Sequence, residues 1–275
     1  VLEREATVLR REGAVSNVVK VATLSSVMIG LLLYQLEVTA GSARSRLNVL
    51  SLLIDLPSIM ELGWCTNYIR ARPRNELDIS SGALAPSVHA AGWFILTVLR
   101  AVATTIPIMV ITWPMIGLGE SLENWLAMFG MVLMAKIIIF LLVLFPSIRA
   151  DTDEVAYGQF AVFTIVWYQA RGWFVRKEAN TAFSRGLMTI NPARSIWQRM
   201  SVLLFAGKEL PCDGAGNATT NDSMQQVCPM PGNALLQQNS LEDEPWNDVI
   251  VCGVWIIVAF FVRYRGTYRK NAGGN

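Results

Sequence analysis

The residues whose types could do chemistry are ionisable side chains inside long apolar segments. Asp55, Arg100 and Lys136 each lie within such a segment. A charge at the centre of a membrane-crossing helix costs about 2.5–3.5 kcal/mol on insertion scales, so it usually faces protein or water. Asp55 is therefore expected either to face a cavity or to pair with Lys136 or Arg100, and both alternatives stay open. We expect the two cations to be structural, pairing with Asp55 or Glu61 or donating hydrogen bonds to carbonyls.

Catalytic and metal chemistry need residues that this sequence does not combine. His89 is its only histidine, and no second histidine, cysteine or carboxylate lies at ligand spacing from it, which predicts no metal site. A single histidine leaves little general-base chemistry, and we find no Ser-His-Asp arrangement. The phosphate-cradling run Gly-x-x-x-x-Gly-Lys-Ser/Thr is also missing from the sequence. We therefore expect no catalytic residues and no cofactor in this chain.

The composition indicates that lipid is the solvent of this chain. Of its 275 residues, 53% are hydrophobic and only 16% are charged, whereas a soluble domain carries about 25% charged residues. The net charge of +2 is small, and we find no basic-aromatic patch of the kind that grips phosphates, so we expect no nucleic-acid partner. Membrane lipids are the first partners that the composition predicts.

Six apolar segments predict an all-α membrane protein with six transmembrane helices. A membrane-crossing helix needs roughly 20 mainly apolar residues. The predicted spans are residues 18–38, 47–69, 88–118, 122–148, 155–175 and 246–262. A polar stretch from Arg70 to Ser87 separates the second span from the third. Residues 1–17 are charged and amphipathic, which predicts a helix with a solvated or headgroup-facing side, and they do not resemble a secretory signal.

A long loop, about residues 176–245, is predicted before the last span. Its first part, residues 183–205, is semi-apolar and interrupted by Gly186 and Pro192. This pattern predicts a short re-entrant or interfacial helix pair, because irregular backbone at membrane depth must be buried in protein. The second part of the loop, residues 207–245, is polar and rich in Gly, Asn and Pro, which predicts exposure to water.

Two features place the polar part of this loop on the extracellular side. It carries glycosylation sequons at Asn217 and Asn221. Cys212 and Cys228 flank these sequons, and a disulfide between them would remove about 3 kcal/mol of unfolded-state entropy. Disulfides persist on the oxidising side of a membrane. Two unpaired thiols in a loop are the alternative.

Basic residues agree with this orientation. Clusters of Lys and Arg lie in the N-terminal stretch, after the second span and in the C-terminal tail. An even number of spans places all three clusters opposite the sequons, which is the cytosolic side by the positive-inside rule. Arg44 and Arg46, in the first outer loop, run against the rule. We therefore predict an integral membrane protein of the plasma membrane or an endomembrane, with both termini cytosolic.

Several sequence runs share their order and spacing with one known family. They are Met28–Leu36, Pro114-Met115-Ile116-Gly117-Leu118, Gly172–Val175, Ile190-Asn191-Pro192-Ala193-Arg194, Phe205–Cys212, and Cys228-Pro229 followed by Gly232–Leu236. Together they resemble the ABC-2 type transmembrane domain of G-subfamily ABC transporters, the white, sterol and pleiotropic drug-resistance group. The stretch Leu77–Leu84 departs from the family pattern: Gly82 is kept, but the family's Arg is absent and Leu84 replaces its Tyr.

The resemblance implies a division of the chain and a function. Residues 1–17 would be the amphipathic connecting helix and residues 18–275 the transmembrane domain, with no nucleotide-binding domain, because the ABC signature Leu-Ser-Gly-Gly-Gln is absent as well. The chain would be the permease domain of an ATP-driven exporter, half of a translocation pathway for amphipathic or lipid-like molecules. ATP and Mg²⁺ would bind a missing or partner ATPase domain. A second transmembrane domain, as homodimer, heterodimer or other half of a full transporter, would complete the pathway. The alternative is a non-transporting scaffold or a degenerate pseudo-transporter.

The resemblance also assigns candidate site residues. The second span is similar to the helix that lines the family's substrate cavity, where Asp55 shares one helical face with Leu52, Leu56 and Ile59. In the fifth span, the positions that contact substrate in the family hold Thr164, Ile165 and Tyr168. Trp173 and Phe174 fall where the family has a hydrophobic plug above the cavity, and ordinary aromatic-belt anchoring is the alternative for them.

Overall fold

The structure is a computed structural model that describes residues 14–60, 62–119, 121–150, 152–169, 171, 181–211, 230–241, 250–258 and 260–261. Within these ranges the chain is mostly helical. The helices are α2 (Ala14–Leu32), α3 (Ala43–Met60), α4 (Leu62–Ser80), α5 (Pro86–Ile116), α6 (Leu122–Arg149), α7 (Asp153–Gln169), α8 (Ala182–Ile190), α9 (Pro192–Phe205) and α10 (Gly232–Gln238). A last helical stretch covers residues 250–258 and 260–261. The strands β1 (Glu209–Leu210) and β2 (Met230–Pro231) pair antiparallel.

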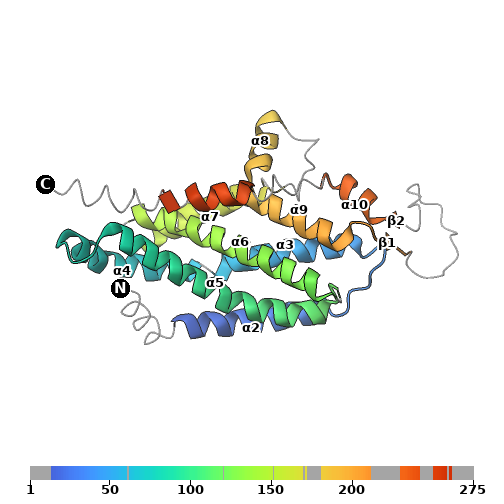
Figure 1. Ribbon diagram of the computed structural model, residues 1–275, viewed down its shortest axis with the longest axis horizontal. Helices are drawn as coiled ribbons and strands as arrows, with labels where there is room; N and C mark the ends of the chain where they lie inside the picture. Colours follow the sequence, from blue (N-terminus) through green and yellow to red (C-terminus); the bar gives the residue numbers. More distant parts are fainter. Residues whose placement is uncertain are drawn as a thin grey trace.

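The helices form one elongated bundle. Figure 1 shows α2 to α7 and α9 running roughly along the long axis, with the β1–β2 hairpin and α10 at one end and the turn from α4 to α5 at the other. Only α8 stands away from the bundle in this view. Helix α2 packs along α5, and the two come so close that a Cβ atom on Gly30 would lie 2.6 Å from the sulfur of Met115.

Two helices are long and apolar enough to cross a membrane, judged by length and composition: α5, and α6 over Leu122–Phe140. Helix α5 begins at Pro86 and ends where Gly117 adopts the left-handed conformation, with φ of 71°. Proline fits the first turn of a helix, because the backbone N–H that it lacks would have no intrahelical partner there. Glycine fits the left-handed cap. The predicted segments 88–118 and 122–148 are thus helical, with ends close to those expected.

The first two predicted spans need correction at their ends. Helix α2 stops at Leu32, six residues before the predicted end, since Gln35 has a positive φ of 45° and donates its backbone N–H to the Met115 carbonyl at 2.7 Å. The polar stretch after the second span is helical for most of its length, because α4 continues to Ser80.

A periodic pattern explains why this polar stretch is helical. Tyr68, Asn75 and Ile79 are buried, and their spacing of seven and four residues places them on one face of a helix. Composition alone hides this face, because charged residues, basic before Asn75 and acidic after it, occupy many of the positions between. Pro73 lies inside α4, where it removes one backbone hydrogen bond.

Residues 183–205 form the predicted helix pair. The break comes at Asn191, whose side chain accepts a hydrogen bond of 2.9 Å from the Ala193 backbone and so caps α9. Pro192 then occupies the first turn of α9. Gly186, predicted to be the other break, lies within α8 instead. Whether the pair sits at membrane depth stays a prediction.

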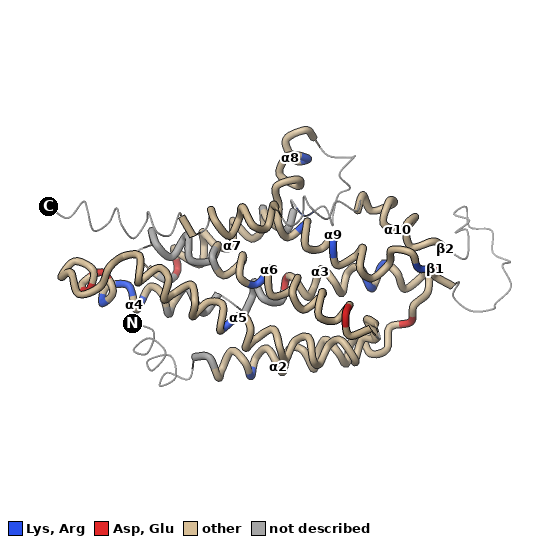
Figure 2. The backbone as a smooth tube through the Cα atoms, viewed as in Figure 1, with Lys and Arg blue, Asp and Glu red and all other residues tan. Residues whose placement is uncertain are grey.

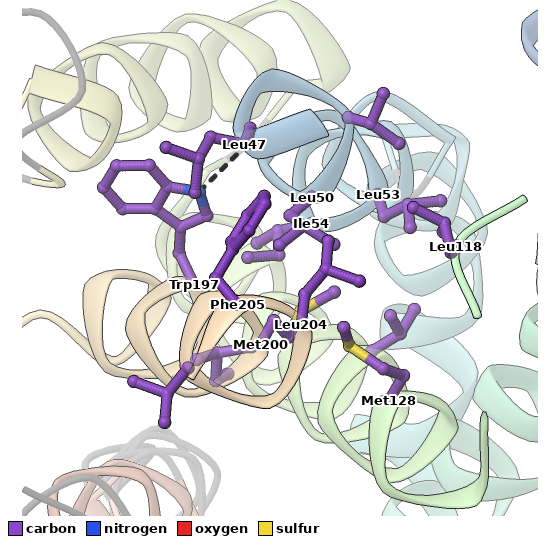
Figure 3. Close-up of a cluster of buried hydrophobic side chains, with 14 of the residues drawn as sticks. Leu47, Leu50, Leu53, Ile54, Leu118, Met128, Trp197, Met200, Leu204 and Phe205 are labelled. Carbon is purple, nitrogen blue, oxygen red and sulfur yellow. Dashed lines mark hydrogen bonds between the residues drawn. The ribbon is translucent and has the colours of Figure 1, made fainter. Parts of the chain in front are cut away.

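The core lies where α9 packs against α3 and α6. Figure 3 shows apolar side chains of α3 and α9 directed toward one another, with the indole of Trp197 donating to the Leu47 carbonyl. This hydrogen bond is 3.1 Å long. Nearly all of α9, from Pro192 to Phe205, is buried, so the short helix contributes most of its surface to the core.

Candidate substrate pathway and buried polar network

The carboxylate of Asp55 is paired with Arg171, which follows α7. Arg171 is fully enclosed, with 1% of its side chain exposed against 16% for Asp55. The same guanidinium donates to Ser51, to the hydroxyl at 2.6 Å and to the carbonyl at 3.3 Å. Ser51 and Asp55 are four residues apart on α3 and so lie on one face. Of the two alternatives for Asp55, this geometry supports an ion pair between helical segments, with Arg171 in place of Lys136 or Arg100.

Arg194, on α9, extends this network to the turn after α10. Its guanidinium donates to the Arg171 carbonyl at 2.9 Å and to the Ser240 carbonyl at 2.8 Å, and the side chain is buried. Two arginines therefore join α3, the residue after α7, α9 and the turn after α10. Neither arginine was a sequence-based candidate. The available signal was that Arg171 interrupts the apolar run of the fifth predicted span.

Lys136 and Arg100 make contacts between α5 and α6. The buried Lys136 ammonium donates to the Thr104 hydroxyl at 2.5 Å. The buried Arg100 guanidinium lies over the Phe140 ring, 5.3 Å from its centroid, a distance at which a cation is attracted by the ring face. Both contacts hold two helices together, which agrees with the structural role expected for these cations.

The candidate cavity residues fall in different surroundings. On α3, Leu52 is exposed, while Leu56 and Ile59 are in the helix but their side chains lie outside the described residues. On α7, Ile165 is exposed and Thr164 is half-buried. The side chain of Tyr168 is not among the described ones. A shared substrate cavity of these residues stays a prediction.

Thr164 lines a groove between α6 and α7. The groove is open to the outside and has room for about one water molecule. Its lining residues are Ile139, Leu142, Phe160, Phe163, Thr164 and Trp167. The Thr164 hydroxyl donates to the Phe160 carbonyl at 2.8 Å. The Trp167 indole nitrogen is buried and finds no acceptor among the described residues. Sequence reasoning singled out Thr164 but missed Trp167.

Trp167 also stands at a junction of three segments. Its ring meets Phe163 of α7 at 5.3 Å and Trp255 of the last helical stretch, edge to face, at 5.4 Å. Its carbonyl accepts a hydrogen bond of 2.9 Å from Asn191, the residue between α8 and α9. Trp255 donates its own indole N–H to the Ile190 carbonyl at 2.6 Å. The two neighbouring indoles thus differ: one N–H is satisfied by protein and the other is not.

Several predicted site residues lie outside the described residues. They are the plug candidates Trp173 and Phe174, the disulfide candidates Cys212 and Cys228, and the glycosylation candidates Asn217 and Asn221. Their assignments stay predictions. In the described part of the chain, no three His, Cys, Asp or Glu side chains gather as metal ligands would. His89 is buried beside Trp93, with ring centroids 6.4 Å apart.

No known family model matches this chain, and no curated protein matches it significantly. Its function must therefore be argued from the residues and their geometry.

Proposed function

We propose that this chain crosses a lipid bilayer and is the permease domain of an ATP-driven exporter of the G subfamily. It would form half of a translocation pathway for amphipathic or lipid-like molecules. Six spans would place both termini in the cytosol. An ATPase domain, which binds ATP and Mg²⁺, would supply the energy, and a second transmembrane domain would complete the pathway.

The observation that carries the proposal is an inverted distribution of charge and apolar surface. Large apolar side chains are exposed on α2, α5 and α7 and on the last helical stretch, among them Leu24, Leu99, Val162 and Ile257. Charged side chains are buried instead, namely Arg46, Arg100, Lys136, Arg171 and Arg194. Charged residues are almost never fully buried in soluble proteins unless paired, whereas charges within membrane helices face the bundle interior. Figure 2 shows how few charges α2 and α5 carry.

Buried hydroxyls on α5 also support a membrane environment for this helix. Thr97, Thr104, Thr105 and Thr112 are buried, and each donates to the carbonyl four residues earlier, at 2.6–3.0 Å. A hydroxyl that bonds its own helix needs no water or partner chain. Helix α5 thereby satisfies these four hydroxyls within a segment 31 residues long.

The order of elements supports the transporter assignment. Two of the resembling runs fall at element boundaries: Gly117 ends α5, and Asn191 with Pro192 begins α9. Two runs that are distant in sequence also touch, because a Cβ atom on Gly232 would lie 2.0 Å from the Phe205 carbonyl oxygen. Only glycine permits so close an approach of two backbones. Two of the resembling runs thus meet where α9 ends and α10 begins.

Reconstituted vesicles test the proposal. The chain would be placed in vesicles with and without the ATPase domain that accompanies it in its native membrane, and movement of a fluorescent short-chain phospholipid would be followed after ATP is added. We expect ATP-dependent movement only with the ATPase domain present. Equal, slow movement in both preparations, with ATP hydrolysis intact, would refute transport of this class of molecule and favour a scaffold.

A further inference from the structure

We propose that Arg194 is a positioning residue, which holds the end of α7 near α3 and so keeps Arg171 on Asp55. Through the Ser240 carbonyl, the same guanidinium connects this ion pair to the turn after α10. The inference rests on the proposed function in one respect. If α3 and α7 line the translocation pathway, they can separate on the outer side only when the hydrogen bonds of Arg194 break.

The end of α7 needs hydrogen-bond donors from elsewhere in the chain. The last four carbonyls of a helix have no partner in their own helix, and α7 ends at Gln169. Asn191, the capping residue of α9, donates its amide N–H to the Trp167 carbonyl at 2.9 Å. Arg194 donates to the Arg171 carbonyl, just past the helix, also at 2.9 Å. A cation beside the C-terminus of a helix is favoured by the helix dipole. The start of α9 therefore caps α7.

Helix α9 can position α7 because it is itself fixed on α3. Nearly all of α9 is buried, and Trp197 donates to the Leu47 carbonyl of α3 at 3.1 Å. Arg194 and Trp197 are three residues apart on α9, so their side chains lie on neighbouring parts of one face. This face of α9 thus contacts both α3 and the segment after α7, and it sets where Arg171 stands relative to Asp55.

The shape of the guanidinium matters for this role. Its two terminal nitrogens bond different segments, Nη1 the Arg171 carbonyl and Nη2 the Ser240 carbonyl at 2.8 Å. The Arg194 side chain is only 4% exposed. A lysine ammonium is a point charge without this rigid fork. The loss of Arg194 would therefore release two segments at once.

The turn after α10 has an unusual backbone at the residue that Arg194 contacts. Ser240 has a positive φ of 55°, at a helix end where glycine is the usual residue. The next residue, Leu241, donates its N–H to the Leu236 carbonyl at 2.9 Å and closes the turn. Such conformations persist where their surroundings fix them. Because α10 lies at the hairpin end of the bundle (Figure 1), Arg194 links that end to the ion pair.

A distance measurement between α3 and α7 tests the proposal. Spin labels would be attached to p-acetylphenylalanine in place of Leu52 and Ile165, two exposed residues on α3 and α7, so that the cysteines stay unlabelled. Double electron–electron resonance would be recorded in lipid nanodiscs with an excess of unlabelled chain. We expect one narrow distance in the unaltered chain. Arg194→Gln should add a longer distance and raise the ratio of longer to shorter about tenfold, the worth of one charged hydrogen bond.

Further variants separate positioning from general damage. Arg171→Gln should produce the same longer distance, and adding it to Arg194→Gln should change nothing more, because both act through one ion pair. Two unrelated structural defects would instead multiply their effects. Arg194→Lys keeps the charge without the fork and should give an intermediate ratio. Arg199→Gln, a matched change on another face of α9, should keep the single narrow distance.

Two results would overturn the proposal: an unchanged distance distribution in Arg194→Gln, or effects of Arg194→Gln and Arg171→Gln that multiply. If far-UV circular dichroism shows that Arg194→Gln does not fold, an unchanged distribution in Arg194→Lys overturns it instead. The measurement uses neither ATP nor an ATPase domain. A failed transport assay therefore leaves this test standing, and unchanged distances leave the proposed transport standing.

Discussion

Replacing the charges of Asp55 and Arg171 one at a time should have unequal costs. Removing one member of a buried ion pair costs about 3–5 kcal/mol because the other charge stays buried. Asp55→Asn leaves Arg171, 1% exposed, with a charge that a guanidinium cannot lose, so we expect about 4 kcal/mol. Arg171→Gln leaves a carboxyl that can neutralise itself by taking up a proton, so the loss reduces to that of a charged hydrogen bond, about 2 kcal/mol.

The double variant completes the cycle. Asp55→Asn with Arg171→Gln should cost no more than Arg171→Gln alone, about 2 kcal/mol, because neither buried charge remains. Unfolding free energies would be measured in mixed micelles by titration with a denaturing detergent, followed by far-UV circular dichroism. Glu123→Gln is the matched control: it removes an exposed carboxylate in the first turn of α6 and should change stability little.

The reasoning fails if the two single costs add to the double cost within about 0.5 kcal/mol, the behaviour of independent sites. The same variants address the cavity interpretation of Asp55. If the carboxylate contacts substrate, Asp55→Asn should change the range of transported molecules even in a chain that already carries Arg171→Gln. If the carboxylate serves only the ion pair, the Arg171→Gln variant and the double variant should transport the same range of molecules.

Three further outcomes can be checked on the purified chain. Gly232→Ala should destabilise it by more than 2 kcal/mol, since the added Cβ atom would lie 2.0 Å from the Phe205 carbonyl oxygen and overpacking costs about 1–3 kcal/mol; an unchanged melting temperature would contradict this. Trp197→Phe loses the 3.1 Å hydrogen bond to the Leu47 carbonyl and should cost about 0.5–1.5 kcal/mol, the net worth of one hydrogen bond, measured by the same detergent titration. Cys212→Ser should slow migration on a non-reducing gel to that of the reduced chain, whereas identical migration of oxidised and reduced unaltered chain would refute the predicted disulfide.

The sequence predicts helices most accurately where a long apolar run is bounded by residues that favour the start and the end of a helix. Helices α5 and α6 have long apolar runs, and Pro86 and Gly117 mark the ends of α5 through properties of single residues. Helix α4 was hidden because its buried residues, spaced seven and four positions apart, are separated by mostly polar ones. In such a segment, periodicity decides the structure and composition misleads.

The site was predicted in part, for a physical reason. An ionisable residue in an apolar segment needs a partner, so Asp55 could be singled out from its position alone. Which cation reaches it depends on how α3 and the end of α7 are packed, and that is a property of the fold. Arg171 lies 116 residues away in sequence. Trp167 was missed because its indole nitrogen becomes unusual only once its surroundings are known to offer no acceptor.

The short β1–β2 pairing has a consequence for engineering the chain. Glu209 lies opposite Pro231 and Leu210 opposite Met230, so the two chain positions that flank the intervening residues are next to each other. An epitope or a fluorescent protein inserted between these strands would be attached to the fold through β1 and β2, which are already paired with each other. The helices beneath would keep their packing, because neither end of the insert pulls on them separately.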